Sequence, residues 1–468
     1  MRYPSLLLAT AALAGCTVGP DYAGPPATAA DAVTRGTFVR GARAAPVPPV
    51  ARWWETLGDA TLTVLVDDAL AHSPTIDQAT ARLREAQAKL GQQRTAALPS
   101  ASANATVLNA RVPGIGGGGG STDLTFYNAG LNASWEPDLF GGTRRGTEQA
   151  KANVGARVAD LADAQVSLSA QVAQAYVGLR DVQERIRLNT ASAGLQRRQL
   201  ALTRQRFAQG TASQLTVERL GNQLENTQAQ AIPLAAQRDE LLDRLALLTG
   251  QTPGALDATL TPAAAIPLPP ARVAVDTPAA LIARRPDVRS AERQLAAATA
   301  GIGVSKAKEL PGIRFLGLLG LGGTSPGDVL DPAKLTTLLA PSLSWSFLDF
   351  GRARAATRAS EAQRDQADAA YRQAVLAALQ DAEASLSRFA NARSQLAQLL
   401  EAEASATRAA TLNRQRVAAG TSTVIDQLEI ERQLLAARIA VSEARAGLTD
   451  SYIAVNKALG LGWSEPGG

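Results

Sequence analysis

Residues 143–209 read TRRGTEQAKANVGARVADLADAQVSLSAQVAQAYVGLRDVQERIRLNTASAGLQRRQLALTRQRFAQ, a run without proline. Within this run, mostly apolar residues follow one another at alternating steps of four and three, the heptad period of a helix that packs along a seam. The seam positions are Val154, Val158, Leu161, Gln165, Leu168, Val172, Ala175, Leu179, Val182 and Ile186. At about 1.5 Å per residue, one helix over this run would be about 100 Å long. The pattern therefore predicts a single very long helix that ends at Gly210.

The same design returns in the second half of the chain. Residues 204–211 read RQRFAQGT, and residues 414–421, which lie 210 positions later, read RQRVAAGT. Trp135 and Trp345 are separated by the same 210 positions. A repeat of this length indicates a duplicated structural half, because short solenoid repeats have periods of about 20–50 residues. We therefore predict an internally duplicated chain that is mainly α with a small β part.

The composition argues against most kinds of catalytic and metal site. The chain has one Cys and one His, too few for the usual nucleophile-base pairs and metal-ligand sets. No paired carboxylates lie in a Gly- or aromatic-rich pattern, so we predict no enzyme, no metal and no cofactor other than a covalent lipid. The net charge of +5 is spread without a Lys/Arg block interleaved with aromatic residues, which argues against a nucleic-acid partner.

The first residues have the form of a bacterial export signal. Residues 1–15 combine Arg2 with an apolar run that is too short to span a bilayer, so we predict a signal peptide. The letters LAGC at 13–16 resemble the lipobox of bacterial lipoproteins, which implies cleavage before Cys16 and attachment of lipid, such as palmitate, to that residue. The alternative is an ordinary signal cleavage site beside an incidental Cys. Residues 16–58 are rich in Pro, Gly and Ala, so we predict a lipid-anchored extended tether.

Between the helical stretches, the pattern changes to the alternation of period two that is typical of strands. It does so twice in each half, on either side of a loop that contains glycine. For the first repeat, residues 59–250, we predict strands at 100–112 and 124–137 and long helices at 143–209 and 213–248. A linker at 251–275 follows. For the second repeat, residues 276–460, we predict strands at 313–322 and 334–348 and long helices at 352–418 and 423–459, before a tail at 461–468.

Four strands in one chain cannot close a membrane barrel alone. Strands of about ten residues have the length needed to cross a membrane. The smallest barrels need about eight strands, and an open edge in lipid would leave backbone groups unpaired, so several copies must share one barrel. Three copies would supply twelve strands and enough long helices for a tube, although periodicity alone leaves the copy number open.

These features together resemble the TolC-like outer-membrane factors, in particular the lipoprotein branch of OprM-type efflux channels. The resemblance rests on the lipobox, the letters CTVGPDY at 16–22, Trp53-Trp54, the two similar halves and their paired tips, and it covers essentially the whole mature chain. It implies a homotrimer with a twelve-stranded β-barrel in the outer membrane and a long α-helical coiled-coil barrel in the periplasm. It also implies a periplasmic adaptor (membrane fusion protein) and an inner-membrane RND-type pump, with this chain as the passive exit duct for drugs or other small molecules.

The same resemblance assigns a partner to the two tips at which long helices meet. In the family these tips form the periplasmic entrance and contact the adaptor. The corresponding residues here are Phe207, Gly210, Thr211, Val417, Gly420 and Thr421. Gly210 and Gly420 are also expected to end helices in a left-handed conformation, which is compatible with adaptor contact.

An entrance gate is implied just beyond the second tip. Asp426 and Glu429 are three positions apart and so share a helix face, and the resemblance implies that such residues ring the closed entrance. Threefold repetition would bring their carboxylates together in the narrowest part of the lumen. The alternative is an exposed helix face on which Glu429 pairs with Arg432. The first half has Thr216 and Arg219 at these places, so an acidic ring would come from the second half alone.

A lipid-anchored periplasmic coiled-coil scaffold or adaptor without a pore is the alternative function. Long helices and a lipid anchor would suit such a protein equally well. The two strand pairs discriminate between a channel and a scaffold, because a scaffold has no need of alternating strands at matched places in both halves. The channel reading is therefore favoured.

Overall fold

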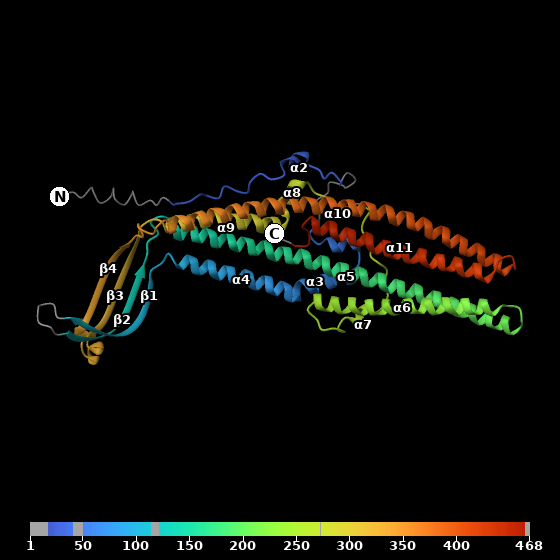
Figure 1. Cartoon of the computed structure of the whole chain (residues 1–468), viewed down its shortest axis with the longest axis horizontal. Helices are drawn as coiled ribbons and strands as arrows, with labels where there is room; N and C mark the ends of the chain where they lie inside the picture. The colour runs from blue at the N-terminus through green and yellow to red at the C-terminus, as the bar shows by residue number, and fades with distance from the viewer. Residues whose placement is uncertain (1–16, 41–49, 114–120, 272, 464–468) are drawn as a thin grey trace. The chain divides into compact units, whose positions relative to one another are not determined.

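The computed structural model describes residues 17–40, 50–113, 121–271 and 273–463. These residues form a mainly helical chain with one small sheet, as the sequence predicted (Figure 1). Cys16, the predicted site of lipid attachment, and the glycine-rich stretch 114–120 lie outside the described residues. None of the described helices is both long enough and apolar enough to cross a membrane.

The helices of the two halves follow in the same order, and the longer ones match in length. In the first half they are α3 (Ala60–His72), α4 (Pro74–Thr95), α5 (Gly142–Ala208) and α6 (Gln214–Leu248). In the second half they are α8 (Pro278–Arg284), α9 (Pro286–Ala307), α10 (Arg352–Ala418) and α11 (Val424–Ala458). α5 and α10 have 67 residues each, and α6 and α11 have 35 each. The bounds predicted for these four long helices differ from the observed ones by one residue at most.

The four strands form one antiparallel sheet. They are β1 (Ser100–Pro113), β2 (Ser121–Trp135), β3 (Gly312–Gly323) and β4 (Leu335–Ser344), in the order β1-β2-β3-β4. The two predicted strand pairs are thus joined through β2 and β3, which the sequence did not predict. Gly130 faces Gly320 across this join, and a Cβ on Gly130 would lie only 2.5 Å from the Gly320 Cα atom, so the backbones meet where side chains are absent.

One strand is shorter than predicted. The sequence pattern extended the fourth strand over 334–348, whereas β4 ends at Ser344. The chain then turns, because Phe350 and Gly351 both adopt positive φ angles, 53° and 84°, that no strand contains.

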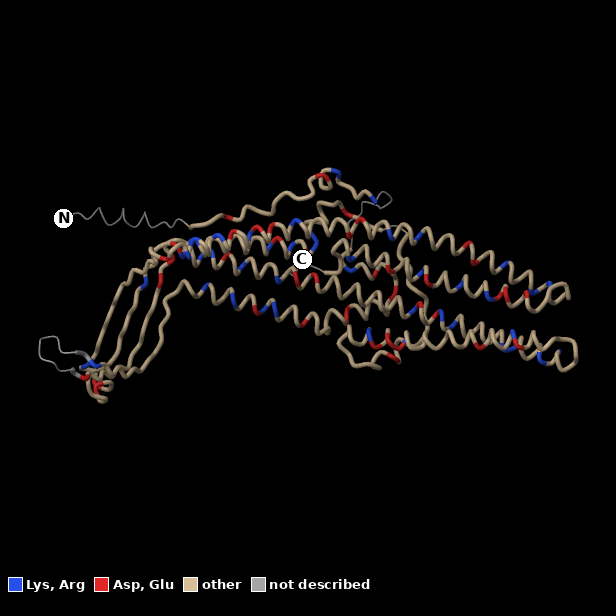
Figure 2. The backbone as a smooth tube through the Cα atoms, viewed as in Figure 1, with Lys and Arg blue, Asp and Glu red and all other residues tan. Residues whose placement is uncertain are grey.

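The chain divides into two compact units. Unit 1 comprises Met1–Pro26, Arg82–Val158 and Ser290–Arg372 and contains the sheet. Unit 2 comprises Ala27–Ala81, Ala159–Arg289 and Gln373–Gly468 and contains both helix-helix turns at the ends of the long helices. Charged residues are frequent on the helices and sparse on the sheet, as Figure 2 shows. The charged residues of the four strands are Arg111, Asp123 and Arg314.

The middle of α5 is buried on almost every side. Five of the predicted seam residues are at most 4% exposed, namely Leu168, Val172, Ala175, Leu179 and Val182. Tyr176 and Arg180, which lie off the seam, are equally buried, and the Arg180 guanidinium lies 4.7 Å above the Tyr176 ring. Arg180 also donates to the carbonyl oxygen of Pro262 at 2.8 Å and so fixes the connection between the halves. Periodicity predicts the seam but not this additional burial, because the covering segments are remote in sequence.

The segment predicted to be an extended tether, residues 16–58, is attached to the folded body. It contains the short helix α2 (Ala30–Arg35) and the 3₁₀ turn η1 (Trp53–Leu57). Trp53 and Trp54 are 1% and 2% exposed. The segment predicted as an extended tether is therefore attached at Trp53 and Trp54, because large aromatic side chains bury enough apolar area to hold such a segment in place.

Candidate functional site

The two long helical hairpins end in turns of the same geometry. We call α5 with α6 the first hairpin and α10 with α11 the second hairpin. At the first turn, Gly210 has a φ of 72° and the N–H of Thr211 donates to the carbonyl oxygen of Arg206 at 2.9 Å. At the second turn, Gly420 has a φ of 73° and the N–H of Thr421 donates to the carbonyl five residues earlier at 2.8 Å. Both turns are Schellman C-caps, which explains why the letters GT recur.

The residues predicted to contact an adaptor all lie at these two turns. Gly210, Thr211, Gly420 and Thr421 close the turns, and each Thr hydroxyl donates to the same carbonyl as its N–H, at 3.0 and 3.1 Å. Phe207 and Val417 lie one helical turn earlier. Phe207 is 45% exposed, whereas Val417 is half-buried. The structure therefore gives the four closing residues a structural role, and the first tip presents Phe207 together with Leu215, which is 59% exposed, as large apolar side chains.

Asp426 lies in the first turn of α11, where it completes a capping box with Thr423. The Thr423 hydroxyl accepts the N–H of Asp426 at 3.1 Å. In return, the Asp426 carboxylate accepts the N–H of Thr423 at 3.2 Å and its hydroxyl at 2.7 Å. These hydrogen bonds from Thr423 lower the pKa of the Asp426 carboxyl below its ordinary value. Asp426 is thus an exposed, ionised group that is held at a helix N-terminus.

Glu429 is exposed and pairs with Arg432 on its own helix. The two Arg432–Glu429 hydrogen bonds are 2.8 and 3.1 Å long and lower the pKa of the Glu429 carboxyl. Glu429 and Arg432 line one side of a groove of about 450 Å³ between α11 and α6, and Glu218 and Arg219 line the other side. The structure therefore brings Glu429 into the same groove as Arg219, its counterpart in the first half.

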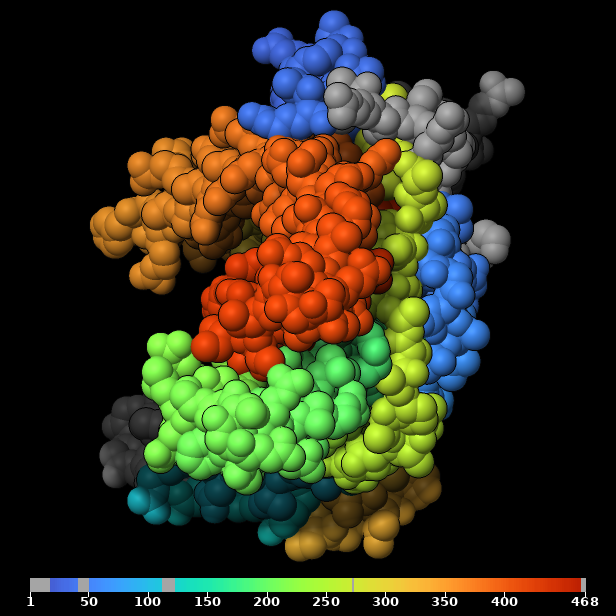
Figure 3. Space-filling view, turned by 90° about the vertical axis from the view of Figure 1, so that its right-hand side faces the viewer, coloured from blue at the N-terminus to red at the C-terminus, as the bar shows by residue number. Residues whose placement is uncertain are grey.

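The interior of the first hairpin near its tip is mainly apolar, although Gln196 and Thr203 are also buried there. Leu200 and Leu220 are 5% and 0% exposed, and they form a cluster with Ala193 and Leu224. Val424 and Leu428, at the start of α11, pack against this cluster. Figure 3 shows the two hairpin ends in contact, the first in green and the second in orange-red. The predicted gate residues thus lie on a helix whose first turns rest on the first hairpin.

The interior of the second hairpin near its tip contains a network of polar side chains, which was not predicted from the sequence. Asn413 and Gln427 are each 5% exposed. The Asn413 amide donates to Gln427 at 3.1 Å, and Gln427 donates to Glu431 at 2.8 Å. The Ser422 hydroxyl donates to Asn413 at 2.8 Å. The sequence feature that could have indicated this network is an amide residue at an inward-facing position on each of the two helices, Asn413 on α10 and Gln427 on α11.

Arg145 attaches the segment that follows Cys16, a contact that the sequence analysis also missed. Its side chain is 3% exposed and donates to the carbonyl oxygens of Val18 and Gly19 at 3.1 and 3.2 Å. It also binds the carboxylates of Asp21 at 2.6 Å and Glu148 at 2.8 Å. A buried guanidinium requires this many acceptors. Only Glu148 lies nearby in the sequence, and the acceptors on Val18, Gly19 and Asp21 are more than 100 residues away, so no local pattern identifies them.

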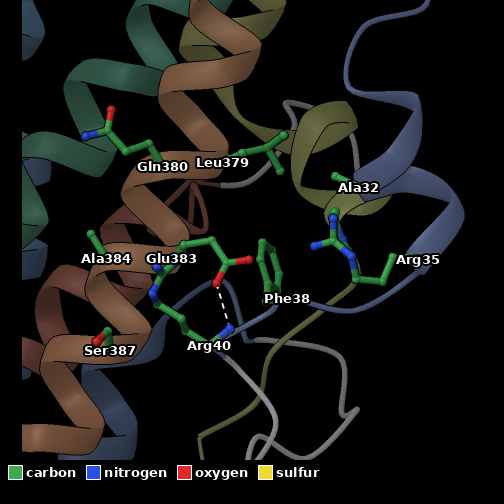
Figure 4. A pocket seen from close by; sticks show the side chains of 10 residues that line it. Ala32, Arg35, Phe38, Arg40, Leu379, Gln380, Glu383, Ala384 and Ser387 are labelled. Atoms are coloured by element: carbon green, nitrogen blue, oxygen red, sulfur yellow. Dashed lines mark hydrogen bonds between the residues drawn. The ribbon is translucent and has the colours of Figure 1, made fainter.

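Two further contacts hold the same segment. The Tyr22 hydroxyl donates to Glu292 at 2.7 Å, and burial, followed by this bond to a carboxylate, raises the pKa of Tyr22. In unit 2, the Glu383 carboxylate accepts the backbone N–H of Val39 at 2.7 Å and that of Arg40 at 2.8 Å, and Figure 4 shows the bond from Arg40. The adjoining pocket of about 570 Å³ is open, and its Arg side chains are exposed. It therefore serves to position the chain and shows no built ligand site.

Two acidic residues, buried Asp181 on α5 and half-buried Asp450 on α11, interact electrostatically. The Asp181 carboxylate of α5 accepts the Ser442 hydroxyl at 2.7 Å, and Arg185 lies 3.6 Å from its second oxygen. One carboxyl oxygen of Asp450 on α11 is buried without a hydrogen-bond partner. Burial, followed by the charge of Asp181, raises the pKa of Asp450 to about 7. Across the described ranges, no group of three or more His, Cys, Asp or Glu residues could hold a metal ion.

Comparison with known proteins places these features in a family. Residues 65–251 and 277–461 match the family model described as outer membrane efflux protein. The pyoverdine export outer membrane protein OpmQ of Pseudomonas aeruginosa is 29% identical over 89% of this chain and 88% of its own. Outer membrane protein OprJ of the same species is 28% identical over 99% of this chain and 98% of its own. The solved structure of the outer-membrane channel OprN is 31% identical, with a TM-score of 0.88 over 96% of this chain and 100% of that one.

Proposed function

This chain belongs to the outer membrane efflux protein family, and from that premise we propose that three copies of it assemble into one exit duct. The chain is an outer-membrane channel component of an efflux system, and members of the family work with a periplasmic adaptor and an inner-membrane pump. In the proposed assembly, three copies supply twelve strands to a barrel and twelve helices to a tube below it. The duct catalyses no reaction, and an RND-type pump supplies the energy.

The open sheet carries this proposal. β1 and β4 are its edges, and they run in opposite directions because each strand is antiparallel to the next. β4 of one copy can therefore pair with β1 of the next copy in the same antiparallel manner. Charged residues are confined to the two ends of the sheet, so each strand retains an uncharged stretch of about ten residues, the length of a membrane-spanning strand. Closure between copies would leave no unpaired edge in lipid.

Equal helix lengths and matched turns support two further parts of the proposal. The halves descend from one duplicated unit, since α5 and α10 are equally long and end in the same turn. In the proposal, Cys16 carries the lipid. Two contacts of Val18 support this assignment, because they hold the residues after Cys16 close to the end of β2: the Arg145 side chain donates to its carbonyl oxygen, and its N–H donates to the carbonyl oxygen of Phe140 at 3.0 Å. A lipid at Cys16 would then enter the bilayer that surrounds the sheet.

The hairpin tips are the proposed periplasmic entrance and adaptor contact. Phe207 supplies an exposed apolar side chain there, and Asp426 and Glu429 supply the acidic gate. The names of the relatives refer to pyoverdine export and antibiotic efflux, so the proposed cargo is small organic molecules. The proposed exit path is passive.

Mass measurement of the detergent-solubilised protein tests the assembly. We expect a trimer by native mass spectrometry, because three four-stranded sheets supply the twelve strands of the proposed barrel and leave no open edge. A stable monomer with both edges exposed would overturn the proposal.

Conductance in planar bilayers tests the gate. The double variant Asp426→Asn with Glu429→Gln removes both charges, while the Asn side chain can still accept the hydrogen bonds of the capping box. We expect its conductance to rise several-fold, because cations bound between the carboxylates would no longer hold the three tips together. Glu218→Gln, a charge removal in the same groove on α6, is the matched control and is expected to leave conductance near that of the parent. Equal conductance of all three proteins would contradict the gate assignment and leave the channel itself untouched.

A further inference from the structure

A groove runs along one face of the second hairpin. It has a volume of about 560 Å³, and α10 and α11 form its two walls. Four of the residues that α11 contributes are small, namely Ala440, Ala444, Gly447 and Ala454. A Cβ on Gly447 would meet nothing within 4 Å, so the groove is open over this position. Its volume lies in the range of about 300–1,000 Å³ that is usual for sites of small organic molecules.

The opposite face of the same hairpin is covered by other segments of the chain. On α10, the Arg393 guanidinium donates to the carbonyl oxygen of Ala271 at 3.0 Å, and Glu383 accepts two backbone N–H groups of the N-terminal segment. On α11, the Thr449 hydroxyl donates to the carbonyl oxygen of Pro267 at 2.6 Å. At about 3.6 residues per turn, the groove residues of both helices lie on the other side from these contacts.

In the proposed assembly, the uncovered face lines the duct. Twelve helices can enclose an open lumen only if the segments that cover the hairpins lie outside the tube. The groove is on the other face and therefore opens into the lumen, on the path of the cargo. No segment within the described ranges fills it.

Two opposite charges line the groove without neutralising each other. Asp450 belongs to the wall formed by α11, and Arg388 belongs to the wall formed by α10. The Oδ1 atom of Asp450 is buried and has no hydrogen-bond partner. Arg388 is exposed and donates to the Ser385 hydroxyl at 3.2 Å, and in the described part of the chain neither charged side chain forms an ion pair. A buried carboxylate without a partner is costly, so a bound group that supplies the partner is favoured.

The third charged residue of the groove, Glu443, already has a partner. The guanidinium of Arg185 on α5 lies 3.4 Å from the Glu443 carboxylate and 3.6 Å from that of Asp181. Asp450 and Arg388 are therefore the two charges that the groove offers to a ligand.

We propose that this groove binds zwitterionic small molecules on their way through the duct. An ammonium group of the ligand pairs with Asp450, its carboxylate pairs with Arg388, and its apolar part rests on the small residues of α11. A guanidinium suits this role because it can bind a carboxylate through two parallel hydrogen bonds. The inference rests on the proposed function, which supplies the lumen, and adds to it a class of cargo.

A simple organic cation is the other ligand that Asp450 would suit, and Arg388 argues against it. A cation in the groove would leave the guanidinium without a partner and would be repelled by it. A ligand that carries both charges gives each side chain its partner.

Fluorescence anisotropy with the full-length trimer in lipid nanodiscs tests the ligand class. The probe is Nα-dansyl-lysine, which carries a carboxylate, an ammonium group and an apolar ring system. Its methyl ester lacks the negative charge, and dansyl-norleucine lacks the ammonium group. We expect saturable binding of Nα-dansyl-lysine and an affinity at least about tenfold lower for each analogue, because each analogue loses one charge-assisted pair.

Removal of each charge from the protein should affect only the probes that carry the opposite charge. Asp450→Asn should weaken the binding of Nα-dansyl-lysine about tenfold and leave that of dansyl-norleucine unchanged. Arg388→Gln should weaken the binding of Nα-dansyl-lysine by a similar factor and should not weaken that of the methyl ester. Glu240→Gln is the matched control, because Glu240 is the exposed first-hairpin counterpart of Asp450, and this variant should bind all three probes like the parent.

The affinity should also depend on pH. Burial, followed by the charge of Asp181, raises the pKa of Asp450 to about 7, and the other charged groups at this site are Arg185, Arg388 and Glu443. A proton on Asp450 competes with the ammonium group, so Nα-dansyl-lysine should bind about tenfold more tightly at pH 8 than at pH 6. Asp450→Asn should abolish this dependence.

Three outcomes would overturn the inference. A trimeric parent that binds none of the probes, or binds all three equally, would do so and leave the proposed function standing. Weaker binding in Asp450→Asn but not in Arg388→Gln would assign the groove to simple cations instead. A monomeric parent would remove the proposed function as well, because the groove would then line no lumen.

Discussion

The first and second hairpins have equal helix lengths and the same turns, yet near its tip the second buries a network of amide side chains where the first buries mainly apolar ones. The first hairpin buries Leu200, Leu220 and Leu224, whereas the second buries Asn413 and Gln427 at a comparable level. Apolar contact has no direction and tolerates small displacements. Buried amides require every partner in place, because an unpaired polar group costs about 1–3 kcal/mol. One backbone plan thus supports two kinds of interior.

The difference matters because the proposed gate residues lie on the second hairpin alone. α11 exposes Asp426 and Glu429 on its outer face and buries Gln427 between them. Its position relative to α10 therefore depends on directional bonds at the same level as the acidic groups. The first hairpin, whose apolar cluster also receives Val424 and Leu428 of α11, provides the support on which this helix rests.

The largest effect is expected from removing an apolar side chain from the interior of the first hairpin. Leu220→Ala should reduce the free energy of unfolding by about 2–5 kcal/mol, since Leu220 is fully buried and would leave a cavity. Ile430→Ala, at the corresponding position of the second hairpin, should cost less than half as much, because Ile430 is only half-buried. Thermal unfolding followed by far-UV circular dichroism measures both. Equal losses would show that the two interiors are alike.

The pH dependence of stability should also differ between the two hairpins, because Asp450 of α11 has a raised pKa. The pKa of Asp450 is raised from 3.8 to about 7, so the unfolded chain releases this proton at lower pH than the folded chain does. Stability should therefore fall as pH rises from about 4 to about 7, by up to about 4 kcal/mol, and remain low above that range. Asp450→Asn should remove the loss and be more stable than the parent at pH 8.

The control for this pH series is Glu240→Gln on α6. Glu240 occupies the corresponding position of the first hairpin and is exposed, so its replacement should leave the pH profile of the melting temperature unchanged. If Asp450→Asn melts at the same temperature as the parent at both pH 5 and pH 8, the buried acid does not influence stability.

The smallest effect is expected from breaking the hydrogen bond between Asn413 and Gln427 in the second hairpin. Gln427→Val should cost about 1–3 kcal/mol, because it leaves the Asn413 amide buried without its acceptor. Asn413→Thr together with Gln427→Val copies Thr203 and Val217 of the first hairpin and should recover most of that loss. Chemical denaturation of the parent, of Asn413→Thr and Gln427→Val alone and of the double variant gives the coupling free energy. Additive losses in the double variant would mean that the two amides do not act as a pair.

Features set by neighbouring residues could be predicted from the sequence. The heptad steps of 143–209 predicted α5 to within one residue at each end, because a helix depends on contacts three and four positions apart. The recurring GT at the tips predicted left-handed glycines for the same local reason. The capping box of Thr423 and Asp426 was readable in the same way, from an acid three positions after a threonine, and went unrecognised.

The sequence by itself thus determined the long helices, the strands and the turns, together with the motifs that identify the family. Tertiary structure alone decided which distant groups meet. The join of β2 to β3, the seating of residues 17–22 on Arg145 and the pairing of Asn413 with Gln427 all depend on such meetings. The physical reason is that a buried charge or amide specifies only that it needs partners, and the fold determines which remote residues supply them.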